Sequence, residues 1–102
     1  MVATQTTIRC DSDHLSYEGA CSIANQASAT SGHDMIRLEL QRVVETTTAA
    51  LARLIALRRN LRRSGRDLMI TGLCGQAESI YEFNRMATLL PRDSQPAEAM
   101  AR

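Results

Sequence analysis

The chain has 102 residues, a formal net charge of +1 and an aromatic content of only 3%, with no Trp. That length allows one domain with one modest core, and a nearly neutral chain lacks the gross charge that attracts DNA or anionic membranes. Because bases stack on aromatic side chains, the scarcity of aromatics also argues against a platform for single-stranded nucleic acid.

The sequence also argues against a membrane protein, a secreted protein, a disulfide-stabilised protein and a metalloprotein. No apolar run is close to the length of a membrane span, which is about 18 residues. No basic segment followed by an apolar one marks a signal peptide. Cys10, Cys21 and Cys74 are odd in number without CxxC spacing, which favours reduced thiols and a cytoplasmic location. His14 and His33 lie far apart in the chain, so we expect surface residues rather than metal ligands, and no cofactor.

The first half of the chain predicts two strands and a helix. TTIRC at 6–10 is rich in β-branched residues and predicts a strand. The Ala-rich segment 16–30 has apolar residues at helical spacing, and Ser16 with Glu18 marks its start. MIRLEL at 35–40 alternates apolar and charged residues, as a half-buried strand does.

The second half carries stronger signals. A long helix is predicted over 48–64, and Gly65 is its expected C-cap. A strand over 66–73 and a helix over 76–86 follow, and Phe83 is expected to face the core. The other residues predicted to point inward are Leu38, Leu40, Ala50, Leu54, Leu57, Leu61, Ile70 and Ile80.

The order of elements predicts the fold class. Strands and helices that alternate imply an α/β domain with a mixed, mostly parallel sheet, right-handed crossovers and helices packed on one face. We expect this single domain to span residues 5–91. The polar residues 92–102 are expected to form a frayed, disordered tail.

Three consecutive threonines, Thr46, Thr47 and Thr48, precede the long helix. A Thr at a helix start can cap a free N–H group, which is worth about 1 kcal/mol. A phosphate at the same place would gain those donors and the favourable field of the helix. The residues alone therefore leave two interpretations open, a simple cap at Thr47 or Thr48 and a modified hydroxyl at Thr48.

The end of the long helix carries an arginine cluster. One interpretation is a surface for an acidic partner or nucleic acid. The other is a solvated helix face, because cations at a helix C-terminus gain about 0.3–1 kcal/mol each. The net charge of +1 favours the solvated face. The cluster consists of Arg58, Arg59, Arg62, Arg63 and Arg66.

The segment IRLELQRVVETTTAALARLIALRRNLRRSGRDLMITGLCGQAESIYEFNRMATLLP resembles the later two thirds of a STAS domain, the fold of anti-sigma-factor antagonists. The family pattern is a strand reading like vvLDLSxVxfIDSSGL, a long helix, a basic stretch ending in Gly, a strand, then l.gl and a helix. RLELQRVVETTTAAL takes the place of the first part, and LRRSGRDLMITGL matches the second closely. The resemblance covers residues 5–91 and rests on pattern rather than on a catalytic signature.

The resemblance implies a non-enzymatic module that docks a protein partner, an anti-sigma kinase or a similar protein, through the loop and helix start. Aligned without gaps, Thr48 takes the position of the serine that the kinase phosphorylates, and Thr47 that of the preceding Asp. Ala49, Ala50 and Leu51 take the positions of the following Ser, Gly and Leu. The phosphoacceptor candidate is thus Thr48. The expected partner contacts are Thr46, Thr47, Thr48, Ala49 and Leu51.

The same resemblance leaves a second function open. The family's Asp and Gly are replaced by Thr47 and Ala50, so the chain is alternatively a constitutive STAS-like subunit, for example of a lipid ABC transport complex, without phosphorylation. A Thr-nucleophile enzyme is disfavoured, because no His, Lys or paired carboxylate stands at a recognisable spacing from the threonines.

Overall fold

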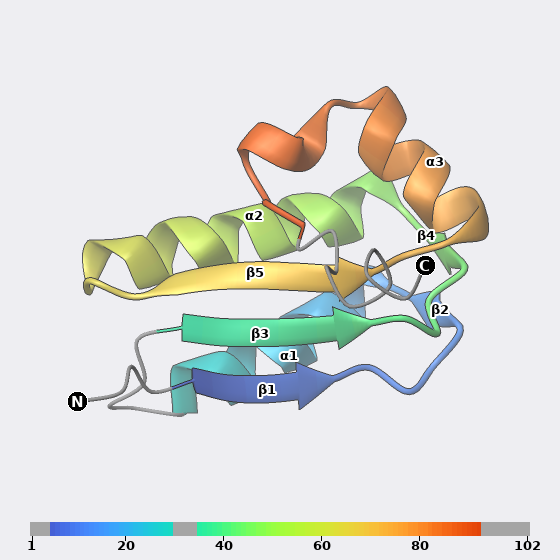
Figure 1. The fold of residues 1–102 in the computed structure, drawn as a ribbon. Helices are drawn as coiled ribbons and strands as arrows, with labels where there is room; N and C mark the ends of the chain where they lie inside the picture. The colour runs from blue at the N-terminus through green and yellow to red at the C-terminus, as the bar shows by residue number, and fades with distance from the viewer. Residues whose placement is uncertain (1–4, 30–34, 93–102) are drawn as a thin grey trace, which may run out of the picture.

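The central element of the fold is a three-stranded parallel sheet. The computed structural model describes residues 5–29 and 35–92. Strands β1 (Gln5–Arg9), β3 (Met35–Leu40) and β5 (Asp67–Gly72) pair in the order β1-β3-β5 (Figure 1). Helices α1 (Tyr17–Ala29) and α2 (Thr48–Arg63) connect these strands and pack against each other. The predicted α/β class with a parallel sheet is confirmed.

Smaller elements complete the chain. Strands β2 (His14–Leu15) and β4 (Glu45–Thr46) form a separate two-stranded parallel sheet. Helix α3 (Gly75–Phe83) contacts β4, and a short 3-10 helix, η1 (Met86–Thr88), follows it. The sequence did not predict β2 or β4, because two residues are too few for a periodic pattern.

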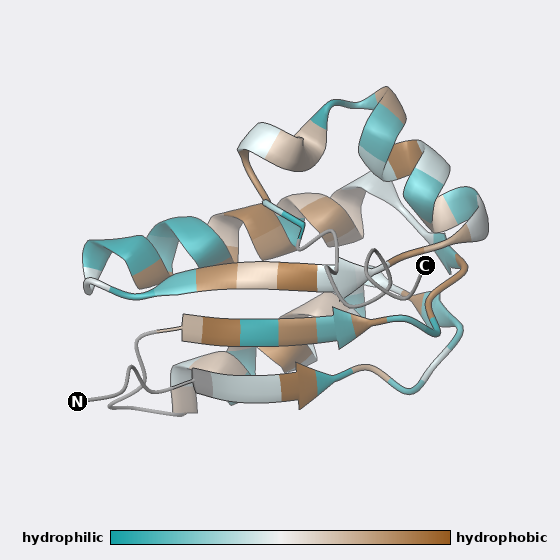
Figure 2. Cartoon of the chain, in the orientation of Figure 1, coloured by the Kyte–Doolittle hydropathy of each residue, from teal (hydrophilic) through white to brown (hydrophobic). Residues whose placement is uncertain are grey.

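The core lies between the sheet and the helices. In β3, Ile36, Leu38 and Leu40 are fully buried while the residues between them are only partly covered, so one face of the sheet meets the helices. Figure 2 shows the matching alternation of hydrophobic and hydrophilic residues along β3. The predicted stripe of α2 is confirmed, since its inward residues are buried. These residues are Ala50, Leu51, Leu54, Leu57 and Leu61.

The end of α2 follows the predicted capping chemistry. Gly65 has a φ of +80°, a conformation that glycine adopts without steric cost. The N–H of Gly65 donates to the carbonyl of Arg62 at 3.1 Å, and the N–H of Arg66 donates to that of Leu61 at 2.9 Å. This pair of bonds is a Schellman motif, so the expected role of Gly65 is confirmed.

The prediction that Phe83 faces the core is wrong, because its side chain is 87% exposed. Helix α3 instead buries Ala77 and Tyr81, which lie one turn apart. Phe83 follows Tyr81 by two residues and therefore points about 200° away around the helix. Tyr81 is held in place because its hydroxyl donates to the carbonyl of Leu90 at 2.6 Å.

Arg92, expected to begin the tail, is part of the folded structure. The N–H of Ile70 donates to the carbonyl of Pro91 at 3.1 Å, so this segment pairs with the outer edge of β5. The Arg92 guanidinium donates to the carbonyl of Gly72 at 3.3 Å and pairs with Glu78 at 3.2 Å. Residues 93–102 of the expected tail, like Thr30 at the end of the first predicted helix, lie outside the described residues.

Candidate functional site

The start of α2 distinguishes the roles of two threonines. Thr47 is the N-cap, and its hydroxyl oxygen accepts a hydrogen bond from the N–H of Ala50 at 3.0 Å. Thr48 is the first helical residue and is exposed, as predicted. Among the described residues, neither the Thr48 hydroxyl nor the N–H groups of Thr48 and Ala49 have a hydrogen-bond partner. The hydroxyl and two helix N–H groups therefore face solvent together.

Thr46 and Leu51, both expected as partner contacts, are buried and so cannot touch a partner directly. Thr46 is 3% exposed, and its hydroxyl donates to the carbonyl of Leu15 at 2.9 Å. Its N–H donates to the side-chain oxygen of Gln76, also at 2.9 Å. Leu51 is fully buried, one turn before Leu54 on the inward stripe. Of the expected contacts, Thr47, Thr48 and Ala49 are exposed.

The loop before β4 is fastened to the turn that follows β5. The N–H groups of Leu73 and Cys74 donate to the carbonyls of Leu40 and Val43, at 3.1 and 3.2 Å. The N–H of Ala77 donates to the carbonyl of Val44 at 2.9 Å. Because these bonds join two segments about 30 residues apart, the approach to Thr48 is held by tertiary contacts rather than by local sequence.

A shallow groove runs along α3 beside this loop. It has a volume of about 570 Å³ and is lined by Gln76, Ser79, Ile80, Glu82, Phe83 and Asn84. Gln76 also bonds to Thr46, two residues before Thr48, so the groove adjoins the start of α2. Val44, on the same loop, is 38% exposed. We call the exposed Thr47, Thr48 and Ala49 together with this groove the Thr48–Phe83 surface.

The sequence missed the apolar part of this surface because Phe83 was assigned to the core. A detectable signal was present. Gln76, Ser79, Ile80 and Phe83 follow helical spacing on one face of α3, while Ala77 and Tyr81 follow it on another. A nine-residue helix offers two such faces, and only packing decides which is buried.

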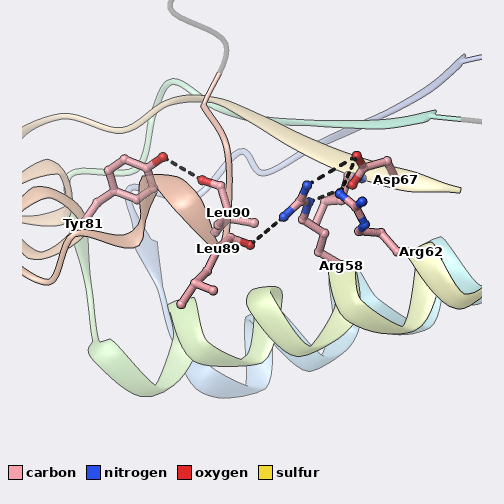
Figure 3. Close-up of polar contacts among 7 residues, drawn as sticks. Arg58, Arg62, Asp67, Tyr81, Leu89 and Leu90 are labelled. Carbon is pink, nitrogen blue, oxygen red and sulfur yellow. Dashed lines mark hydrogen bonds and ion pairs between the residues drawn. The ribbon is translucent and has the colours of Figure 1, made fainter.

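An ion-pair cluster fixes the other end of α2. The Arg58 Nε donates to Oδ1 of Asp67 at 2.7 Å, and Arg62 approaches Oδ2 of the same carboxylate at 3.6 Å (Figure 3). Arg58 also donates to the carbonyl of Leu89 at 3.2 Å, and the N–H of Leu68 donates to Asp67 at 2.7 Å. Burial raises the pKa of Asp67, but the Arg58 and Leu68 hydrogen bonds and the charges of both arginines lower it further, below its ordinary value.

We expect Asp67→Asn to lower the free energy of unfolding by about 1–2 kcal/mol at neutral pH, because Arg58 loses a charged partner. The folded pKa of Asp67 lies below its unfolded value, so the ionised carboxylate stabilises the fold above that unfolded value, about 3.9. This stabilisation is lost as the pH falls through the folded pKa. Urea unfolding of parent and variant at pH 7 and about pH 2.5 measures the difference, which should shrink in acid.

The control for this prediction is Asp11→Asn, since Asp11 is exposed and has no hydrogen bond or ion pair among the described residues. It should change the stability of the protein little at either pH. If the difference in free energy of unfolding between Asp67→Asn and the parent stays constant down to acid pH, the role assigned to the ionised carboxylate is contradicted.

Within 5–29 and 35–92, His, Cys, Asp and Glu side chains nowhere gather in a group of three or more that could hold a metal ion. In the same ranges, no helix has the length and apolar character to cross a membrane. Comparison with known proteins found no matching family model and no matching curated protein.

Proposed function

We propose that this protein is a non-enzymatic regulatory module of the STAS type, similar to an anti-sigma-factor antagonist. It acts in the cytoplasm, needs no cofactor, and docks an anti-sigma kinase or similar protein through the Thr48–Phe83 surface. The observation that carries the proposal is the position of Thr48. It is the first residue of α2, its exposed hydroxyl lies beside free N–H groups, and the groove that contains Ile80 and Phe83 adjoins this helix start.

The geometry supports docking because the surface combines an aromatic anchor with small side chains. Phe83 is 87% exposed, and aromatic residues, Phe among them, are enriched in the cores of protein–protein interfaces. Thr47, Thr48 and Ala49 leave the backbone at the helix start accessible to a partner. Beneath them, buried Thr46 and Leu51 hold the loop and helix in one position.

Control by phosphorylation follows from the same arrangement. A phosphate on Thr48 would add a charge of about −1.5 to −2 at a helix N-terminus, where negative charge is stabilised. The fold would therefore tolerate it. A partner whose apolar or acidic surface packs against Thr48 would not tolerate the phosphate, because the added charge would be desolvated or repelled.

We expect Thr48→Glu to weaken partner binding at least about tenfold while the melting temperature stays close to that of the parent. Thr48→Ala should bind like the parent but no longer respond to a kinase. Phe83→Ser should lose the partner whatever residue stands at position 48. The partner is first captured from the native organism and identified by mass spectrometry, and its affinity for each purified variant is then measured by calorimetry.

The matched control is Ser22→Glu, which places the same charge on an exposed position of α1. It should leave binding unchanged. If Thr48→Glu binds as tightly as the parent while Phe83→Ser does not, the surface docks a partner but is not switched. The chain would then be the constitutive STAS-like subunit of a transport complex or other scaffold.

A further inference from the structure

Charge is strongly segregated along α2. Residues 58–67 contain five arginines and one acid, a net charge of +4, although the whole chain carries only +1. The other residues together are therefore at −3. Figure 2 shows the C-terminal part of α2 as hydrophilic, in contrast to the apolar stretch nearer its start. A favourable helix dipole accounts for cations in the last turn, but Arg58 and Arg59 lie before it.

The one acidic residue of this segment, Asp67, already forms ion pairs within it. Its carboxylate pairs with both Arg58 and Arg62, and Arg58 also donates a hydrogen bond to the carbonyl of Leu89. The Arg59 side chain has neither an ion pair nor a hydrogen bond among the described residues. Arg62 keeps 58% of its side chain exposed despite its contact with Asp67. Arg59 and Arg62 thus present positive charge at the surface of the described part of the protein.

An apolar floor lies between these arginines. A depression of about 160 Å³ is lined by Ile55, Arg58, Arg59, Arg62 and Leu89. Leu89 is 51% exposed, and Figure 3 shows its side chain directed toward α2 and its backbone carbonyl directed toward Arg58. The volume of this depression is smaller than the roughly 300–1,000 Å³ typical of small-molecule sites, so it suits a single side chain of a larger ligand.

We propose that this depression is a second docking site, for an acidic amphipathic segment of a protein. An aliphatic side chain of that segment packs on Ile55 and Leu89, and its carboxylates pair with Arg59 and Arg62. Guanidinium groups suit this task because their planar donors match carboxylate oxygens. Arg58 stays bonded to Asp67 and holds the floor in shape.

The apolar floor favours a peptide over nucleic acid. A sugar-phosphate backbone would gain nothing from Ile55 and Leu89, and the lining includes no aromatic side chain on which a base could stack. Arg59 and Arg62 follow Thr48 by 11 and 14 residues in α2, which corresponds to about 16–21 Å along the helix axis. The site is therefore separate from the Thr48–Phe83 surface and independent of the proposed function.

The experiment uses a short fluorescent peptide in which Glu and Leu are arranged on opposite faces of a helix. Its affinity for the full chain is measured by fluorescence anisotropy at low and high salt. Arg59→Glu should weaken binding about fivefold or more, and Leu89→Ser should weaken it as well. Higher salt should also weaken binding to the parent protein. The matched control, Arg42→Glu, changes the net charge equally at an exposed position outside the lining and should have no effect.

Further probes separate the peptide from other anions. A peptide with each Leu replaced by Ser, a single-stranded oligonucleotide and anionic phospholipid vesicles should all bind more weakly than the first peptide. The proposal fails if Arg42→Glu weakens binding as much as Arg59→Glu, because net charge alone would then explain it. It also fails if the Ser peptide binds equally well, if either other anion binds more tightly, or if the first peptide does not bind.

Discussion

Leu57→Ala is expected to lower the free energy of unfolding by about 2–5 kcal/mol, a large share of the stability of a domain this small. Leu57 is 2% exposed and lies in the middle of the buried stripe of α2, between Leu54 and Leu61. Removing its side chain loses both the burial of apolar surface and the contacts of the atoms that surrounded it. Urea unfolding followed by circular dichroism measures the loss.

Leu89→Ala is the matched control for Leu57→Ala. It makes the same chemical change on a side chain that is 51% exposed, so its cost should be clearly smaller. The backbone carbonyl of Leu89 that accepts from Arg58 is kept in the variant. Equal unfolding midpoints for the two variants would mean that the inward face of α2 has been wrongly assigned.

Gly72→Ala is expected to destabilise the protein by about 2–6 kcal/mol, because backbone strain and a steric clash both contribute. Gly72 has a φ of +95°, and an added Cβ would lie 2.5 Å from the nitrogen of Gln41 and 2.6 Å from the carbonyl carbon of Leu40. These are backbone atoms at the end of β3 and the start of the loop that is hydrogen-bonded to Leu73 and Cys74. The loop cannot move aside without breaking the bonds that fasten it.

The matched control is Gly65→Ala. Gly65 has a similar φ of +80°, but no atom lies within 4 Å of an added Cβ. Its cost should be only the strain of a left-handed residue, about 1–2 kcal/mol. The difference between the two variants in thermal unfolding measures the clash alone. A Gly72→Ala variant as stable as Gly65→Ala would show that the loop before β4 yields freely.

Gly72→Ala should also affect binding. The displaced loop carries Val43 and Val44 and leads into Thr46, which supports the start of α2. Partner binding through the Thr48–Phe83 surface should therefore weaken in Gly72→Ala at a temperature where it is still folded. Gly65→Ala, at the opposite end of α2, should leave that binding unchanged.

What the sequence determined by itself is the part of the fold that local rules control. The stripe of α2 repeats every three or four residues, so burial of Leu54, Leu57 and Leu61 follows from helical geometry alone. Gly65 ends that helix because the required backbone conformation belongs to glycine. The alternation in 35–40 and the order of elements likewise predicted a parallel α/β sheet.

The tertiary structure decided which exposed residues form a candidate site. Thr46 and Thr48 have the same side chain two positions apart, yet pairing of β4 with β2 buries the first and leaves the second in solvent. Packing of α3 buries Tyr81 and exposes Phe83, a choice that its short sequence left open. Asp67 meets Arg58 because a helix and a strand come together. These contacts depend on how helices and strands pack against one another, so no local pattern encodes them.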